Sequence, residues 1–352
     1  MSLFPIYENS VTGERLEVKV PLESRVVANE LKKEIGVPEY IDANDFMMKK
    51  ATVILWASMN PDKFRLAAKS SLKVALLGGA AFKLHCPTCN TESPFNRSVP
   101  DLDLITLKEH GADVISLLCN LGETCGSIFF HGVTSIERRF NAMQEGMRYR
   151  LLTIKAVGDD GVPKPGYVDI FCDKIAFCHE LNVREELADV QKHLFTAGIE
   201  NLILSKAQLI GKLPKKQQVN ITKSRILGEY DNEHLLVGME PKDMMDVAAA
   251  LLDHRIGEGP DKINLAKIGE NLKRDWRLEK TVTLNLGNML RNLDILKTLG
   301  VMQSQTDEIQ KKINIILQEI KEKYKAKKSR FSLTKQWWTN VEEQVLEGVA
   351  VK

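Results

Sequence analysis

Two acidic residues separated by one position are the feature of this sequence most able to do chemistry. Asp101 and Asp103 stand at the start of an apolar segment, residues 102–106, that is predicted to be a β-strand. Because side chains alternate across a strand, the two carboxylates are expected to point the same way and lie close together. Such a pair repels itself unless a proton or a cation lies between the charges. A hard cation, Mg2+ or Mn2+, is the expected ligand because it prefers oxygen donors.

A pair of glycines precedes these acids at the end of another apolar run. Residues 74–77 are predicted to be a short buried strand, Gly78 and Gly79 a tight turn, and residues 80–84 the start of a helix. Glycine permits such a turn, and its backbone N–H groups can approach a phosphate closely. A glycine pair alone is usually only a turn, but together with the two acids it predicts a site for a metal-bound phosphate.

A third acid, Asp169, lies in a later apolar segment over residues 167–171. If its strand neighbours the first one, three carboxylates converge and could hold two metal ions about 4 Å apart. One ion would activate a nucleophile and the other would bind a triphosphate, so that attack on the α-phosphate transfers a nucleotide. The alternative is a surface aspartate, because the apolar neighbours do not show which face of this strand is buried.

The two glycines and three acids resemble the signature of the DNA polymerase β-like nucleotidyltransferase superfamily, and two later segments resemble motifs of its AbiEii-type members. These segments are residues 201–208 and 241–247, and the resemblance extends over roughly residues 72–255. It implies that Lys206 binds nucleotide phosphate and that Asp243 or Asp246 is a later functional acid. AbiEii-type enzymes belong to some toxin–antitoxin and phage-defence systems. The resemblance therefore implies an NTP substrate, a tRNA-like RNA or a protein as acceptor, and a cognate antitoxin as partner.

Two departures from the superfamily pattern keep a second function open. Ala80 stands where the superfamily usually has a serine or threonine, and residues 85–96 lengthen the segment between glycines and acids. The alternative is a binding module that retains the fold and binds nucleotide or a partner with little turnover. Structural alternatives also exist for two of the later residues. Lys206 could extend its ammonium from an apolar helix to solvent, and Asp243 could simply interact with a helix dipole.

Two arginines share one face of a further predicted strand. Arg148 and Arg150 lie in residues 148–154, which are predicted to form a hairpin with residues 140–143. Their guanidinium groups could bind a triphosphate or an RNA backbone. The alternative interpretation is a solvated hairpin.

The cysteines indicate reduced thiols or a metal site rather than disulfides. Cys86 and Cys89 have the spacing of a zinc knuckle, but Cys119 and Cys125 do not repeat that spacing. Free thiols are therefore the favoured interpretation. A zinc-stabilised nucleic-acid-binding protein is the third function considered.

Composition and length set the frame for these motifs. The 352 residues are too many for one small core, and 43% hydrophobic with 27% charged residues is ordinary for a globular protein. A net charge of +2 gives no general attraction to nucleic acid, so any basic surface must be local. The first residues do not resemble a signal peptide and no apolar run is long enough to span a membrane, which predicts a cytoplasmic protein without membrane contact.

The expected fold is α/β (α+β), with a mixed sheet flanked by helices. Three regions are predicted: an N-terminal helical region, residues 1–70; a nucleotidyltransferase core, residues 71–215; and a C-terminal helical domain, residues 216–352. The last region includes a long amphipathic helix near residues 305–330 with a basic end. This helix is expected to pack against a core rather than to bind nucleic acid.

Overall fold

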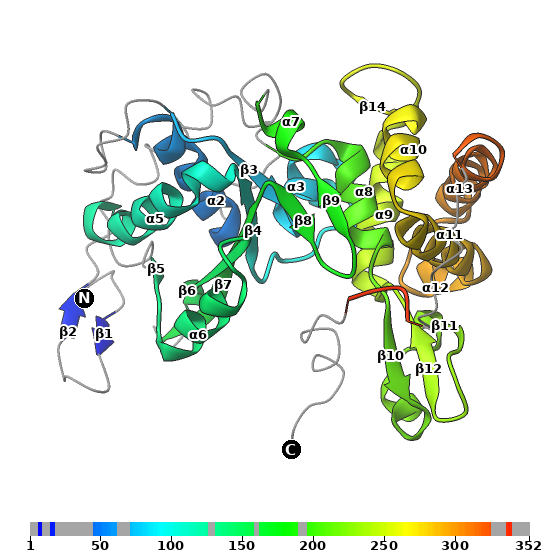
Figure 1. Ribbon diagram of the computed structural model, residues 1–352, viewed down its shortest axis with the longest axis horizontal. Coiled ribbons are helices and arrows are strands. Elements are labelled where there is room, and N and C mark those ends of the chain that lie inside the picture. The colour runs from blue at the N-terminus through cyan, green and yellow to red at the C-terminus, as the bar shows by residue number, and fades with distance from the viewer. Residues whose placement is uncertain are drawn as a thin grey trace. The chain divides into compact units, whose positions relative to one another are not determined.

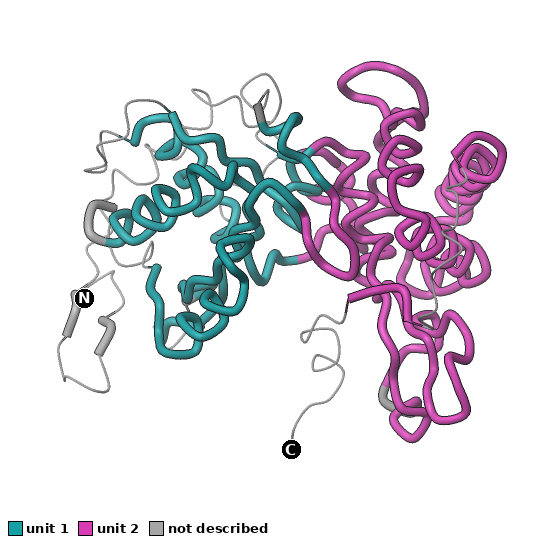
Figure 2. The backbone as a smooth tube through the Cα atoms, viewed as in Figure 1, with its two compact units in different colours: residues 1–84, 98–174, 182–197 teal, residues 85–97, 175–181, 198–352 magenta. Residues whose placement is uncertain are grey.

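The computed structural model divides the chain into two compact units (Figure 2). The residues that it describes are 6–8, 15–17, 45–61, 71–125, 131–157, 162–188, 196–324 and 336–339. Unit 1 comprises residues 1–84, 98–174 and 182–197, and unit 2 comprises residues 85–97, 175–181 and 198–352. These boundaries differ from the three regions predicted from the sequence, because the segment between the glycines and the acids belongs to unit 2.

A five-stranded mixed sheet forms the centre of unit 1, which confirms the predicted fold class (Figure 1). Its strands, in spatial order, are β3 (Val74–Leu77), β4 (Leu102–Thr106), β7 (Pro163–Cys172), β6 (Arg148–Val157) and β5 (His131–Gly132). Strands β4 and β7 are parallel, whereas the other neighbouring pairs are antiparallel. All four residues of β3 are buried, as expected of a short, uniformly apolar strand.

Unit 1 also contains five described helices. They are α2 (Phe46–Met59), α3 (Gly78–His85), α5 (Gly111–Cys125), α6 (Ser135–Met143) and the short α7 (Arg184–Ala188). Helix α2 packs against β3, β6 and α5, and it starts at Asp45, whose side chain accepts hydrogen bonds from the backbone of Met47 and Met48. Helix α6 packs against β6.

The predicted hairpin over residues 140–154 is wrong, because its first arm is helix α6. Thr134 and Glu137 form a capping box: the Thr134 hydroxyl accepts from the Ile136 N–H, and the Glu137 carboxylate accepts from the Thr134 N–H. This local signal starts a helix that ends just before the turn leading into β6. The antiparallel partner of β6 is instead β7.

Unit 2 combines helices with a small sheet. Its helices are α4 (Thr88–Thr91), α8 (Ile199–Ala207), α9 (Pro241–Asp253), α10 (Leu265–Arg274), α11 (Trp276–Arg291), α12 (Leu293–Thr298) and α13 (Gln303–Lys323). The sheet is antiparallel, with β10 (Gly211–Pro214), β12 (His234–Val237) and β11 (Ile226–Glu229) in that order. The C-terminal region is therefore not purely helical. Each strand of this sheet has only four residues, which is too short for a periodic pattern to mark it in the sequence.

Shorter elements complete the described structure. They are the 3-10 helices η2 (Lys108–His110), η5 (Lys215–Asn220) and η6 (Lys223–Arg225), and the strand pairs β1 (Ile6–Glu8) with β2 (Arg15–Glu17), β8 (Lys174–Ala176) with β9 (Glu180–Asn182), and β13 (Arg255–Ile256) with β14 (Lys262–Ile263).

The long amphipathic helix near the C-terminus is confirmed as α13. Four isoleucines at helical spacing are buried along it: Ile309, Ile313, Ile316 and Ile320. Of the predicted N-terminal helical region, residues 1–70, the structure describes β1, β2 and α2, and most of the rest lies outside the described residues, as does the basic run beyond residue 324. In the part of the chain that the structure describes, every helix is too short or too polar to cross a membrane.

Candidate functional site

The three acids predicted from the sequence lie together on the sheet of unit 1. Asp103 on β4 is the direct neighbour of Asp169 on β7 in the parallel register. Asp101 lies just before β4, and its Oδ1 accepts a hydrogen bond of 2.9 Å from the Tyr167 N–H. Burial raises the pKa of Asp101, and the nearby charge of Asp169 adds to this effect, while the Tyr167 N–H and the Lys155 ammonium oppose it. Two strands far apart in the sequence thus supply one group of carboxylates.

Gly78 lies directly against the Asp103 carboxylate. Its φ of +58° is in the left-handed region, and a Cβ added there would come within 2.2 Å of Asp103 Oδ2. The glycine is therefore required both for the strand-to-helix turn and for the close approach of the acid. Gly79 follows in the first turn of α3, whose N-terminal N–H groups favour anions. Ala80, where the superfamily usually has a hydroxyl, is buried with 1% of its surface exposed.

Both predicted arginines bind the third acid. Arg150 Nε donates to Asp169 Oδ1, and Arg148 Nη2 and Arg150 Nη2 both donate to Asp169 Oδ2, each at 2.7 Å. Arg150 lies directly opposite Asp169 in the antiparallel pairing of β6 and β7. The patch is therefore not a solvated hairpin, because Arg148 and Asp169 are each only 6% exposed.

Aromatic rings surround the two guanidinium groups. Arg150 lies 4.8 Å from the Phe140 ring and 4.9 Å from the Tyr167 ring, and Arg148 lies 5.3 Å from Phe140 and 4.7 Å from Phe171. These cation–π contacts restrict where the guanidinium groups can point. Phe140 comes from α6, the helix that sequence periodicity did not identify.

The donor set suits a hard cation, but the arginines compete for it. The three aspartates offer the oxygen ligands that Mg2+ or Mn2+ prefers. In the present arrangement the Asp169 oxygens accept three charge-assisted hydrogen bonds, and two guanidinium charges beside them oppose a cation. Among the described side chains, no group of three or more His, Cys, Asp and Glu residues is arranged to hold a metal ion. Metal binding at Asp169 therefore requires the arginines to exchange partners.

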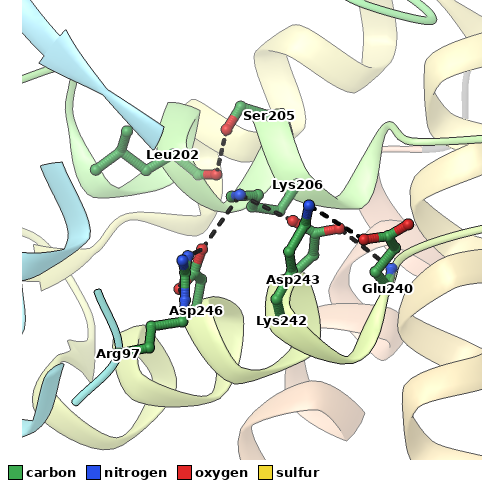
Figure 3. A network of polar contacts seen from close by, with 8 residues as sticks. All are labelled: Arg97, Leu202, Ser205, Lys206, Glu240, Lys242, Asp243 and Asp246. Atoms are coloured by element: carbon green, nitrogen blue, oxygen red, sulfur yellow. Dashed lines mark hydrogen bonds and ion pairs between the residues drawn. The ribbon is translucent and has the colours of Figure 1, made fainter. Parts of the chain in front are cut away.

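The later residues of the resemblance form a separate cluster within unit 2 (Figure 3). Lys206 on α8 places its Nζ 2.8 Å from Asp243 Oδ1 and 3.2 Å from Asp246 Oδ2, both on α9. Arg97 donates from Nε and Nη2 to Asp246 Oδ1 at 3.1 and 2.7 Å. Asp243 also accepts from the Glu240 N–H at the start of α9, so it has the structural role that its position predicted.

The charges of this second cluster balance. Burial alone would lower the pKa of Lys206, but the Asp243 and Asp246 carboxylates outweigh it and raise the pKa well above its ordinary value. Burial alone would raise the pKa of Asp243, yet the Lys206 ammonium keeps it below its ordinary value. Lys206 therefore does not extend to solvent but is a permanently charged, paired ammonium. Its contact with nucleotide phosphate stays a prediction.

The cysteines are distributed over both units. Cys86 and Cys89 are buried beside α4 in unit 2, whereas Cys119 lies half-buried on α5 of unit 1. Burial raises the pKa of Cys86, and a hydrogen bond with Cys89 adds to the increase. The side chain of Cys125 is outside the described residues. The zinc site of four cysteines stays a prediction.

Two residues that contact the candidate residues were not themselves predicted from the sequence. Asn141 bonds the backbone of Arg150, and Arg97 bonds Asp246. Neither carries a spacing signal, since each meets its partner only in the folded chain.

Comparison with protein-family models, with curated proteins and with solved structures finds no match to this chain. Any function must therefore be argued from the residues themselves.

Proposed function

We propose that the protein is a metal-dependent nucleotidyltransferase that moves a nucleoside monophosphate from an NTP to a hydroxyl of an acceptor. The observation that supports this most directly is the pairing of Asp103 with Asp169 across β4 and β7. Asp101 lies beside them, and Gly78 leaves no side chain between the turn and Asp103. Carboxylates beside a glycine turn that opens a helix combine oxygen ligands for a hard cation with backbone N–H groups for a phosphate.

Each residue of this group has a role in the proposed reaction. Asp101, Asp103 and Asp169 would hold Mg2+ or Mn2+, which supplies neutralisation of phosphate charge and activation of the acceptor hydroxyl. Arg148 and Arg150 would bind phosphate oxygens bidentately in exchange for Asp169, with the N–H groups of Gly78 and Gly79 nearby. A polyphosphate offers these guanidinium groups more negative charge than one carboxylate does.

The test is transfer from labelled NTPs in the presence of Mg2+ or Mn2+. Wild-type protein is incubated with each α-labelled NTP and with RNA or protein acceptors, and the Asp101→Asn and Asp103→Asn variants are compared with Asp113→Asn. Asp113 is an exposed acid on α5 of the same unit. Loss of transfer in the first two variants only is expected. The proposal is wrong if the wild type neither binds nor transfers any NTP, or if Asp103→Asn keeps full activity.

A second candidate function is a nucleotide-binding module with little turnover. It is favoured by the Asp169 oxygens being bound to two arginines and by the buried Ala80 in place of a hydroxyl residue. Calorimetric titration with an NTP distinguishes the two functions: binding without transfer supports the module.

The acceptor class and an antitoxin partner rest on the AbiEii resemblance alone. The labelled product distinguishes tRNA-like RNA from protein, since nuclease or protease treatment releases the label accordingly. A toxin role would be supported if expression of the wild type arrests growth and expression of Asp103→Asn does not.

A further inference from the structure

The outer edge of β6 is completed by a side chain instead of a strand. One edge of β6 pairs with β7 along most of its length, while at the other edge the described residues pair with β5 at Leu152 and Thr153. Two residues earlier, the Arg150 N–H donates to Asn141 Oδ1 at 2.6 Å and the Arg150 carbonyl accepts from Asn141 Nδ2 at 3.1 Å. One amide of α6 thus satisfies the donor and the acceptor that a neighbouring strand would otherwise occupy.

This edge contact determines how Arg150 faces its acid. Because both backbone groups of Arg150 point outward, its pairing with Asp169 on β7 is of the non-hydrogen-bonded type. Directly opposed side chains are closest in pairs of this type. A backbone held in this orientation brings the Arg150 side chain directly opposite Asp169.

Phe140, the preceding residue of α6, acts on the same two side chains. Its ring lies 4.8 Å from the Arg150 guanidinium and 5.3 Å from that of Arg148. Helix α6 is itself fixed at its start by the capping box of Thr134 and Glu137. One short helix therefore hydrogen-bonds to the backbone of β6 through Asn141 and places the Phe140 ring against both guanidinium groups.

We propose that Asn141 is a positioning residue for a polyphosphate-binding pair of arginines. Its side chain takes the place of a strand partner at Arg150 and keeps Arg150 ordered beside Asp169, so that a triphosphate that displaces Asp169 meets a guanidinium that is already ordered. The inference rests on the proposed function, because it assigns the triphosphate of an NTP to these arginines. Asn141 itself does not touch the phosphate.

The first test measures binding of inorganic tripolyphosphate by calorimetry in metal-free buffer. Asn141→Ala removes both hydrogen bonds and is expected to weaken binding about tenfold. Asn141→Asp keeps the acceptor for the Arg150 N–H and should lose less. Met143→Ala, which changes an exposed side chain of the same helix, is the matched control and should bind like the wild type. With NTP as substrate, KM should rise in Asn141→Ala while kcat changes little.

The second test reads the arginine directly. The Nε–H of Arg150 bonded to Asp169 Oδ1 should give a slowly exchanging NMR signal in the wild type and in Met143→Ala, and this signal should be lost in Asn141→Ala. If Asn141→Ala does not fold, Asn141→Asp is compared in both tests. Wild-type affinity and an intact Nε–H signal in the tested variant overturn the inference.

The two proposals fail in different ways. Absence of tripolyphosphate and NTP binding by the wild type counts against the proposed function, and the Nε–H signal then decides alone whether Asn141 orders Arg150. Binding by the wild type that is insensitive to Asn141 leaves the proposed function standing and removes Asn141 from it.

Discussion

The two charged clusters of this protein use the same residue types in different proportions. In unit 2, Arg97 and Lys206 face Asp243 and Asp246, so that two cations meet two carboxylates. In unit 1, Arg148 and Arg150 both bind Asp169, while Asp101 and Asp103 lie beside it at half-buried positions.

The difference indicates what each cluster can do. A balanced and enclosed cluster holds elements together, and the one in unit 2 joins α8, α9 and the segment ending at Arg97. In a cluster with two guanidinium groups gathered on one acid, a polyanion can compete with that acid for the arginines. Ligand exchange is thus expected in unit 1 and structural stability in unit 2.

The largest expected effect is on activity and concerns unit 1. Asp103→Asn should lower the rate of nucleotide transfer by at least about 100-fold, because it removes a charge that holds the metal. Its stability should change little, since the acid is only half-buried. Transfer assays and denaturant unfolding of the same preparation check both expectations. If Asp103→Asn loses stability in proportion to its activity, Asp103 has a structural role like that of the unit 2 acids.

Asp246→Asn should have the opposite pattern. It leaves the half-buried Lys206 and Arg97 short of the charge of the buried Asp246, and this loss is expected to cost about 3 kcal/mol of unfolding free energy. Asp294→Asn is the control, because Asp294 forms an exposed pair with Lys297 and its side chain is 90% exposed. That control should change stability by less than about 1 kcal/mol. If both substitutions lower the unfolding free energy equally, the unit 2 cluster stabilises the protein no more than an exposed ion pair does.

Lys50 differs from both clusters, because among the described residues this buried lysine is hydrogen-bonded to a hydroxyl and not to a carboxylate. Its Nζ donates to the Thr153 hydroxyl at 2.5 Å, and burial lowers its pKa to about 7. The unfolded chain therefore holds this proton more tightly than the folded protein does, and stability should rise as pH increases from about 7 toward 10.

Lys50→Met should remove that dependence and stabilise the protein at pH 7 by about 3 kcal/mol. Unfolding by urea at pH 7 and pH 9.5 measures the difference, with Lys49→Met on the same helix as control. A stabilisation that is the same at both pH values would mean that Lys50 is not the titrating group.

The smallest expected effect concerns the glycine turn. Gly78→Ala places a Cβ in a left-handed conformation, which should cost about 1–2 kcal/mol of stability, and it pushes Asp103 aside. Gly79→Ala is the comparison for stability, because the φ of Gly79 is not in that region. Thermal unfolding of both variants checks the difference, and equal melting temperatures would count against a strained turn at Gly78.

Local patterns were enough to predict much of the framework. Apolar runs and turn residues predicted β3, β4 and β7, and an amphipathic pattern predicted the long helix α13. These signals lie within a few residues of each other, so they can be recognised without knowing the fold. Helix α6 was missed although its capping box is local, because Phe140 and the residues after it resemble a strand arm.

The spacing of residues along the chain establishes which chemical groups lie near one another, as Asp101 and Asp103 do, although Asp101 lies just before β4 and not on it. Only the tertiary structure decided that Asp103 adjoins Asp169, that two arginines bind Asp169, and that Lys206 is neutralised by two acids. The physical reason is that spacing along the chain sets orientation only within one element. Strand order, register and helix packing set it between elements, and the charges of this protein find their partners there.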